Sequence, residues 1–375
     1  MKANKSLSVA LVAGVSAFAL VACSPPAKDS GSSGSGSSAA KATSASDVGG
    51  MKGLVTAAEK EGALNVIALP PDWANYGNII KAFEQKYPKI KITSAQPDAA
   101  SQDEVNAAKS LKGTKRAPDV FDLGQSVALA NTQLFAPYKV ATWDDIPSNF
   151  KDANGTWVND YGGYMSIGYD SSKVPAVTGL DSLTGSGFKG KVALNGDPTQ
   201  AGAAFSGVMM ASIANGGSAD DIAPGVDYFG KLKKAGNFVP VDPSSTTIES
   251  GQTPVVIDWD YLNAAESSKV PGWKVVVPDN AVVAGYYYQA INADAPHPAA
   301  ARLWEEFLYS DAGQNLWLGG GARPVRADAM VKAGTIDKQA YDALPPVNGS
   351  SVTPTIPQTE KAAAYLSKNW AQAIG

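Results

Sequence analysis

The stretch that decides the fold is LNVIALPPDWANYGNIIKAFEQKYPKIKIT, residues 64–93. It begins with a short apolar run, residues 64–69, that breaks at two prolines, which predicts a strand followed by a loop. Residues 78–87 then repeat apolar and aromatic side chains at helical spacing, and residues 89–93 alternate as a strand does. A strand–helix–strand unit of this kind predicts an α/β fold.

The same alternation continues on both sides of this stretch. Residues 51–61 favour a helix that ends at Gly62, residues 104–111 favour another, and DVFDL (119–123) reads as a strand. A second unit follows, with strands expected at 161–169, 191–194, 255–257, 274–277 and 286–292, and helices at 207–214 and 298–309. Strands joined through helices run parallel, so we expect two α/β units, a mostly parallel sheet and a ligand cleft between the units.

Composition excludes several classes of function. The chain has 375 residues, of which 44% are hydrophobic and 18% charged, so it can bury a core. Its net charge of −4 argues against nucleic-acid binding, which needs clustered Lys and Arg. The chain holds one Cys and one His, which excludes an internal disulfide, a thiolate zinc cage and most His-based metal sites.

The N-terminal residues predict export and anchoring. Lys2 and Lys5 precede an uncharged apolar run, residues 7–21, which is too short to span a bilayer comfortably and fits a signal peptide over residues 1–22. The run ends at Leu-Val-Ala-Cys, with Cys23 as the only cysteine, and this resembles the lipobox of bacterial lipoproteins. The resemblance implies diacylation of Cys23, and two acyl chains suffice for stable anchoring. Residues 23–46 are rich in Ser, Gly and Ala and are expected to form a flexible tether.

Several short motifs, in order, carry a resemblance to a known family. They are APDV (117–120), YDSSKVP (169–175), FKGKVA (188–193), APHP (295–298) and YSDAGQ (309–314). Together they resemble the family 1 extracellular solute-binding proteins of ABC importers, in the group that includes iron, thiamine and polyamine binders. The resemblance covers about residues 51–330.

The resemblance implies a two-lobed fold of the type 2 periplasmic-binding-protein kind, with two hinge strands, capture of a small solute by closure and delivery to a permease and its ATPase. We expect lobe 1 to comprise residues 47–160 and about 286–320. We expect lobe 2 to comprise residues 161–285 and about 321–375. Such a protein is expected to be a monomer without a cofactor or a bound metal, lipid-anchored at the extracytoplasmic face of the cell membrane.

Loops beyond the carboxyl ends of strands are the expected ligand site, because ligands of open α/β sheets bind there. These loops and the two expected hinge strands are rich in aromatic, amide and acidic side chains. The candidate ligand-binding residues are Asp72, Trp73, Asn75, Tyr76, Gln125, Ser126, Tyr161, Tyr164, Thr199, Gln200, Trp259, Asp260, Tyr261 and Tyr287. For several of them a purely structural role, such as a helix cap or a core tyrosine, is an equal alternative. Asp197 with Pro198 in particular reads as the cap and first residue of a helix.

The chemistry of these loops favours a cationic solute. Aromatic faces attract cations and carboxylates complement ammonium groups, and the loops contain no Lys or Arg. A polyamine or another amine-bearing cation is therefore the preferred ligand. Ferric iron is an alternative, although Tyr261 stands beside Asp260 rather than beside a second tyrosine. Arg323 and Arg326 keep a phosphonate or organophosphate open, because an arginine can bind such a group bidentately.

An enzyme and a passive surface lipoprotein are the remaining classes. The sequence lacks the nucleophile elbow, the His-Glu-x-x-His zinc motif and the phosphate-binding loop. The single histidine, His297, lies between two prolines at a helix start and reads as a surface or capping residue. Asp258 and Asp260 are too close in sequence to predict a glycosidase pair. The chain is therefore expected not to be an enzyme, and the α/β pattern argues against a passive surface lipoprotein.

Overall fold

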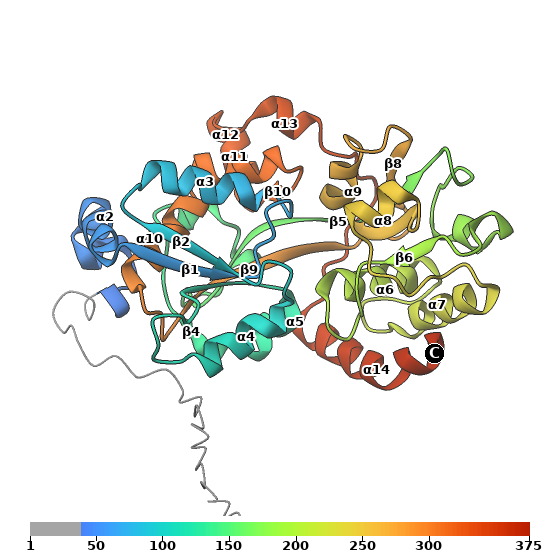
Figure 1. Cartoon of the computed structure of the whole chain (residues 1–375), viewed down its shortest axis with the longest axis horizontal. Coiled ribbons are helices and arrows are strands. Elements are labelled where there is room, and N and C mark those ends of the chain that lie inside the picture. Colours follow the sequence, from blue (N-terminus) through green and yellow to red (C-terminus); the bar gives the residue numbers. More distant parts are fainter. Residues whose placement is uncertain (1–38) are drawn as a thin grey trace, which may run out of the picture.

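A computed structural model describes residues 39–375, and the predicted signal peptide, Cys23 and most of the expected tether lie outside this range. The described chain forms two lobes joined by two long strands, β5 (Val158–Asp170) and β9 (Ala284–Asn292) (Figure 1). The two-lobed α/β fold and the two hinge strands are thus as the sequence predicts.

Lobe 1 is built from the first third of the chain and from a return segment after β9. Its helices and strands are α2 (Gly50–Glu61), β1 (Ala63–Ile67), α3 (Tyr76–Lys86), β2 (Lys91–Ala95), α4 (Ser101–Ser110), β3 (Val120–Leu123), α5 (Gln125–Ala130), β4 (Phe135–Ala136), α10 (Pro298–Leu308), α11 (Asp311–Gly319), β10 (Arg323–Pro324), α12 (Ala327–Ala333) and α13 (Lys338–Asp342).

Lobe 2 contains the middle of the chain and the last helix. Its helices and strands are β6 (Val192–Leu194), α6 (Gly202–Ala214), α7 (Ala223–Ala235), α8 (Ser245–Ser250), β7 (Val255–Trp259), α9 (Asp260–Glu266), β8 (Trp273–Val276) and α14 (Ile356–Ile374). Helix α6 is apolar on all sides and almost wholly buried, as expected of a helix at the centre of a lobe.

The expectation of a mostly parallel sheet is wrong. The β1–β2 and β6–β7 pairs are parallel, but the hinge strands run antiparallel to their neighbours. The first part of β5 pairs with β9, and its last part pairs with β7 and β8, so one strand belongs to the sheets of both lobes. A strand that leaves one lobe and a strand that returns to it must run in opposite directions when they lie side by side.

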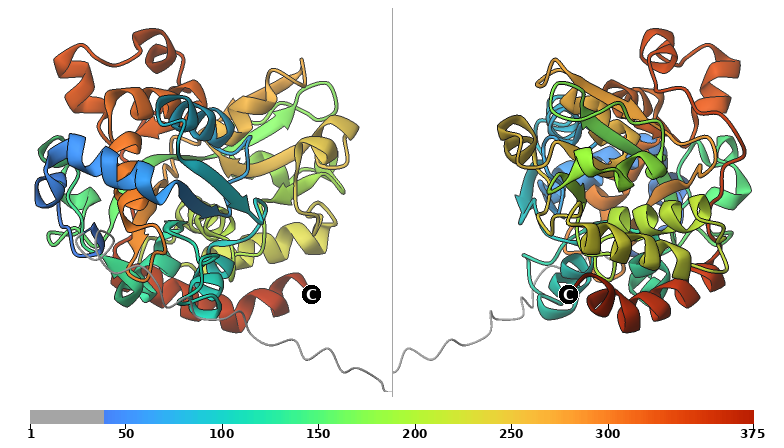
Figure 2. Two further views of the ribbon diagram at one scale, coloured as in Figure 1. Left: turned by 60° about the vertical axis from the view of Figure 1, so that its left-hand side comes forward. Right: turned by 90° about the vertical axis from the view of Figure 1, so that its right-hand side faces the viewer.

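The C-terminal residues divide between the lobes. Helices α12 and α13 follow β10, which pairs with β5, and residues after α12 contact α11 through the hydrogen bond from the Asn315 amide to the carbonyl of Thr335. This part therefore lies on lobe 1, although lobe 2 was expected for residues 321–375. Helix α14 lies beneath α7 (Figure 2) and also contacts α5 of lobe 1. Near its end, Trp370 is edge-on to Phe229 of α7 at 5.4 Å, which places that end on lobe 2.

The folded domain begins earlier than the expected tether ends. Ala39 and Ala42 are buried, and the guanidinium of Arg302 donates hydrogen bonds to the carbonyls of Ala40 and Ala42, at 3.1 and 2.8 Å. Residues 39–46 are consequently packed on α10 of lobe 1. Composition alone missed this, because the anchoring arginine lies about 260 residues further along the chain.

Replacing Arg302 by methionine is expected to lower the free energy of unfolding by about 2–3 kcal/mol. The side chain is 1% exposed, and its loss leaves the carbonyls of Ala40 and Ala42 without their donors. Urea unfolding measures the change. The matched replacement of the exposed Arg116 should leave stability nearly unaltered, and equal effects at both positions would contradict the anchoring role.

Candidate functional site

Aromatic side chains from both lobes meet beside the hinge strands. This aromatic cluster comprises Trp73, Tyr76, Tyr161, Trp259, Tyr261, Tyr287 and Trp317. Tyr161 of β5 stacks on Tyr287 of β9 with ring centroids 5.3 Å apart, and on Trp317 of α11 at 4.3 Å. Trp73, from the loop before α3, meets Tyr261 of α9 edge-on at 6.3 Å, so the cluster joins lobe 1 to lobe 2.

A chain of hydrogen bonds fixes the orientation of Trp73. Its indole nitrogen donates to the hydroxyl of Tyr161 at 2.7 Å, and that hydroxyl donates to Oδ2 of Asp122 at 3.2 Å. Tyr76 donates to the same carboxylate oxygen at 2.7 Å and accepts from the Gln289 amide at 2.9 Å. Asp122, at the end of β3, therefore orders the lobe 1 side of the cluster.

Buried carboxylates surround the aromatic rings. Asp122, Asp160, Asp258 and Asp260 are all at most 7% exposed. Burial raises the pKa of Asp258 to about 7, although Asn195 and the backbone of Trp259 donate hydrogen bonds to it.

Burial also raises the pKa values of the other three carboxyl groups, and for Asp160 the nearby charge of Asp122 adds to the rise. Within residues 39–375, one oxygen of each of Asp122, Asp160 and Asp260 lacks a hydrogen-bond partner. A cation placed near these oxygens would stabilise their charged form.

One arginine reaches this region from lobe 1. Nη1 of Arg323 lies 3.3 Å from Oδ2 of Asp260, which stands at the start of α9 in lobe 2. The guanidinium also lies over the ring of Tyr164, at 4.9 Å from its centroid, and donates to the carbonyl of Pro345 at 2.7 Å. The Arg323–Asp260 pair thus crosses between the lobes.

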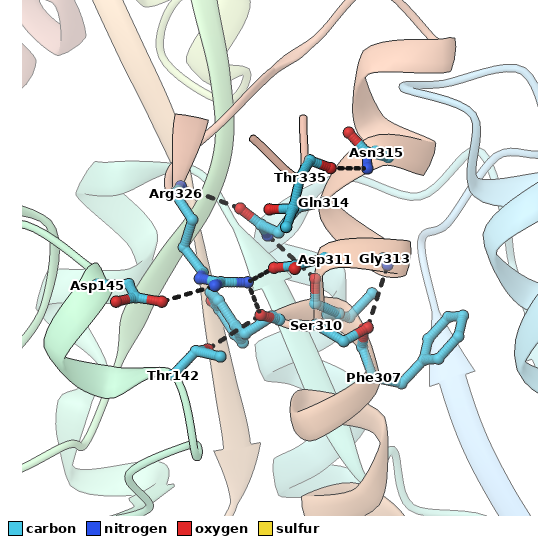
Figure 3. Close-up of polar contacts among 12 residues, drawn as sticks. Thr142, Asp145, Phe307, Ser310, Asp311, Gly313, Gln314, Asn315, Arg326 and Thr335 are labelled. Carbon is cyan, nitrogen blue, oxygen red and sulfur yellow. Dashed lines mark hydrogen bonds and ion pairs between the residues drawn. The ribbon is translucent and has the colours of Figure 1, made fainter. Parts of the chain in front are cut away.

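The second arginine of that segment is used elsewhere. Arg326 donates to the carboxylates of Asp311 and Asp145, at 2.8 and 2.6 Å, and to the carbonyl of Tyr309 at 2.7 Å (Figure 3). These bonds tie β10 to α11 and to the loop around residue 145. Of the two arginines in the possible phosphonate clamp, Arg323 is beside the aromatic cluster and Arg326 is a structural anchor.

Glycines in the hinge strands let the lobe 2 side chains approach. A Cβ on Gly163 of β5 would lie 2.3 Å from Oδ1 of Asp260, and one on Gly285 of β9 would lie 2.3 Å from the ring of Trp259. Neither contact is sterically possible without movement. The glycines are therefore required where Trp259 and Asp260 pack on the hinge.

Replacing Gly285 by alanine is expected to destabilise the protein by about 2–3 kcal/mol, because the added methyl group displaces Trp259. Thermal unfolding and the fluorescence of the displaced tryptophan measure the effect. A methyl group added at Gly179 would meet no atom within 4 Å, so its replacement by alanine is the control. Unchanged unfolding of the Gly285 variant would contradict the close approach.

The structure brings together some of the candidate residues and separates others. Trp73, Tyr76, Tyr161, Trp259, Tyr261 and Tyr287 belong to the aromatic cluster, and Asp260 and Tyr164 adjoin it, the Tyr164 amide donating to Asp260 at 2.9 Å. Two amide side chains among the candidates instead form hydrogen bonds between distant segments of the chain. Asn75 donates to the carbonyl of Leu316, and Gln125 to that of Pro354.

The remaining candidates are solvent-exposed: Asp72, Ser126, Thr199 and Gln200. Thr199 donates to the carboxylate of Asp197 through both its amide and its hydroxyl, which closes a turn. The helix α6 consequently begins at Gly202, and the expected helix start at Pro198 is wrong.

Sequence reasoning missed Trp317, Asp160 and the inward position of Arg323. Asp160 and Asp122 lie near candidate residues at the start or end of a strand, so their positions in the sequence could have predicted that they belong to the site. Trp317 lies in α11 without a distinguishing pattern, and only the tertiary fold places it on Tyr161.

The side chains that could ligate a metal ion are scattered over the described chain. Among residues 39–375, no group of three or more His, Cys, Asp or Glu side chains could hold a metal ion. No helix of that range has the length and apolar character needed to cross a bilayer. His297 occupies the position before the first residue of α10, and its side chain does not cap the helix but lies with Nδ1 2.9 Å from the carboxylate of Asp119.

Solved structures share this fold. The periplasmic binding protein P5PA aligns with a TM-score of 0.64 and 18% identity over 84% of this chain and 100% of its own. A ferric binding protein from Campylobacter jejuni aligns with a TM-score of 0.61 and 17% identity over 83% and 99%. AfuA from Actinobacillus pleuropneumoniae, with fructose-6-phosphate bound, aligns with a TM-score of 0.60 and 18% identity over 83% and 96%. These likenesses show the fold.

The sequence itself identifies the family. No curated protein sequence matches the chain. The model of the bacterial extracellular solute-binding proteins matches residues 119–345, which is more than half of the chain. This range includes both hinge strands and all of lobe 2 except α14, and it confirms the resemblance drawn from the short motifs. The chain therefore belongs to the bacterial extracellular solute-binding proteins, which bind small solutes outside the cytoplasm for ABC importers.

Proposed function

We propose that the protein captures an amine-bearing solute, such as a polyamine, between its lobes and delivers it to the permease and ATPase of an ABC importer. The observation that carries this proposal is the surplus of buried carboxylates over cations at the aromatic cluster. Asp122, Asp160, Asp258 and Asp260 are all buried, and within residues 39–375 only Asp260 of these four forms an ion pair, with Arg323.

An ammonium group would gain from both components of the site. Unpartnered carboxylate oxygens of Asp122, Asp160 and Asp260 offer charge-assisted hydrogen bonds. The faces of Trp73, Tyr161 and the other rings offer cation–π contacts of about 0.5–2 kcal/mol each. A neutral solute would bring no charge to these acids, and they would keep the protonated form that burial favours.

Ferric iron is the second candidate, and the phenol groups of Tyr161, Tyr261 and Tyr287 favour it. One structural relative is a ferric binding protein. Iron binding requires phenolate oxygens, however, and burial raises the pKa values of these three tyrosines. The site therefore offers carboxylates to a cation more readily than phenolates.

The location and the assembly form part of the same proposal. We infer that the lipid-modified Cys23 holds a monomer at the extracytoplasmic face of the cell membrane, and that the protein binds its solute without transforming it. The two lobes would close on the solute by a shift of population from an open to a closed form. A non-enzymatic surface lipoprotein with no solute is the remote alternative.

Isothermal titration calorimetry tests the ligand class. The protein is titrated with spermidine, putrescine, thiamine, ferric citrate and methylphosphonate. We expect saturable binding of an amine and no comparable binding of ferric citrate or methylphosphonate. Tight binding of iron alone would replace the amine proposal, and conversion of any of these solutes into another compound would contradict the binding role.

A further inference from the structure

The Arg323–Asp260 pair is the most unusual polar contact at the site. Its facing atoms, Nη1 and Oδ2, are 3.3 Å apart, yet neither makes a hydrogen bond within residues 39–375. The Asp260 side chain is 0% exposed and that of Arg323 is 15% exposed. Two opposite charges are thus held close together, in a mostly dry place, without the geometry that makes a buried pair favourable.

Other atoms of both side chains have partners of their own. Oδ1 of Asp260 accepts from the amides of Tyr164 and Tyr261, at 2.9 and 3.1 Å. Nη2 of Arg323 donates to the carbonyl of Pro345, and the guanidinium lies over the ring of Tyr164. Both groups are therefore held in place, and Nη1 and Oδ2, which face each other, have no hydrogen bond within residues 39–375.

The residue after Asp260 carries a further polar atom without a partner in the described part of the chain. The Tyr261 hydroxyl is buried and lacks a hydrogen-bond partner among the described residues. This hydroxyl can donate to an anion or accept from an ammonium group. Nη1 of Arg323, Oδ2 of Asp260 and the Tyr261 hydroxyl are thus three buried polar atoms without a hydrogen bond within residues 39–375.

We propose that the solute carries an acidic group as well as its amine, and that Arg323 binds the acidic group while Asp260 binds the amine. This inference rests on the proposed amine-binding function and narrows the ligand to zwitterions, such as amino acids or aminophosphonates. A simple polyamine would put a second positive charge beside Arg323. A zwitterion replaces one poorly oriented ion pair by two charge-assisted hydrogen bonds.

The position of the pair links this chemistry to lobe closure. Arg323 belongs to β10, which pairs with the lobe 1 part of β5, whereas Asp260 begins α9 of lobe 2. A zwitterion held by both residues joins the two lobes. An amine without an acid contacts one lobe at this point, so the acidic group contributes directly to closure.

Matched ligand pairs test the proposal without altering the protein. L-ornithine and putrescine differ by one carboxylate, and 2-aminoethylphosphonate and ethylamine differ by one phosphonate. Calorimetry on the wild-type protein should show at least one acid-bearing member binding roughly tenfold or more tightly than its partner. If in both pairs the plain amine binds as tightly or more tightly, or if no acid-bearing member binds, the inference is overturned.

Variants assign the preference to the arginine. In Arg323→Gln the preference for the acid-bearing member should disappear, and in Arg323→Lys, which keeps the charge but not the fork of donors, part of it should remain. The exposed Arg116→Gln protein should keep the full preference. Circular dichroism confirms that each variant folds. Retention of the full preference in Arg323→Gln overturns the assignment. If Arg323→Gln does not fold, retention of the full preference in both Arg323→Lys and a folded Arg323→Ala overturns it.

The same data separate this inference from the proposed function. Binding of putrescine or spermidine with no gain from an acidic group overturns the zwitterion inference and leaves the amine-binding function standing. Absence of binding for every amine, with or without an acid, overturns both.

Discussion

Replacing Trp73 by alanine is expected to weaken solute binding by on the order of a hundredfold. The indole forms edge contacts with Tyr261 of lobe 2 and Tyr287 of the hinge, and its nitrogen donates to the hydroxyl of Tyr161. Its removal takes away one aromatic wall of the proposed site and the hydrogen bond that the indole donates to Tyr161. Calorimetry with the tightest-binding amine measures the change.

Trp143 offers the matched control. It is also half-buried and on lobe 1, but it lies under the ammonium groups of Lys151 and Lys139, at 4.7 and 5.3 Å. Trp143→Ala should affect stability and leave solute affinity within about twofold. Trp73→Ala protein that folds and binds as tightly as the parent would remove the aromatic cluster from the site.

The second large effect is a fall in the stability of the unliganded protein as pH rises. Burial raises the pKa of Asp258 to about 7, from 3.8 in an unfolded chain. Between about pH 4 and pH 7 the folded state therefore holds a proton that the unfolded state has lost, and stability falls as pH rises through this window. The fall from this one group is at most about 4 kcal/mol, since each pKa unit corresponds to about 1.4 kcal/mol.

Asp258→Asn should reduce this fall, because the amide cannot ionise. Urea unfolding at pH 5 and at pH 8 gives the comparison, with the exposed Asp242→Asn protein as the control. Asp122, Asp160 and Asp260 have pKa values raised by burial as well, so part of the pH dependence remains in the variant. A wild-type protein that is more stable at pH 8 than at pH 5 would contradict the burial of these acids.

Solute affinity is expected to rise with pH, whereas stability is expected to fall. An ammonium group favours the ionised carboxylates, so binding of an amine is expected to release protons and to strengthen by about tenfold between pH 5.5 and pH 8. Calorimetry in buffers of different ionisation enthalpy counts the protons released. Proton uptake on binding would show that the ligand does not pair with these acids.

Local patterns in the sequence were sufficient for most elements. β1, α3 and β2 could be predicted because short apolar runs end at prolines and glycines, and the C-terminal Gly62 of α2 takes the left-handed conformation typical of a helix end. The aromatic residues near strand ends were a sound guide too. Trp73, Tyr161 and Tyr261 lie far apart in the sequence and meet in one cluster.

What could not be predicted depends on contacts between distant segments. Strand direction in the shared sheet follows from how the chain crosses between lobes, and single-strand patterns carry no sign of it. The stacking of Trp317 on Tyr161 and the reach of Arg323 to Asp260 depend on β10 pairing with β5, a pairing of only two residues. The turn at Asp197 is a local feature that the sequence also failed to predict. Asp197 has the chemistry of a helix cap, but its carboxylate accepts from Thr199 and closes a turn before the helix begins.

The two ends of the described chain lie on different lobes. Residues 39–46 are fixed to α10 of lobe 1 by Arg302. The end of α14 lies by α7 of lobe 2 (Figure 1), where Trp370 contacts Phe229. A fluorescent donor fused ahead of residue 39 and an acceptor fused behind α14 would thus ride on separate bodies. Energy transfer between them would report capture of the nutrient in real time, which makes the two ends of this domain suitable attachment points for a genetically encoded sensor.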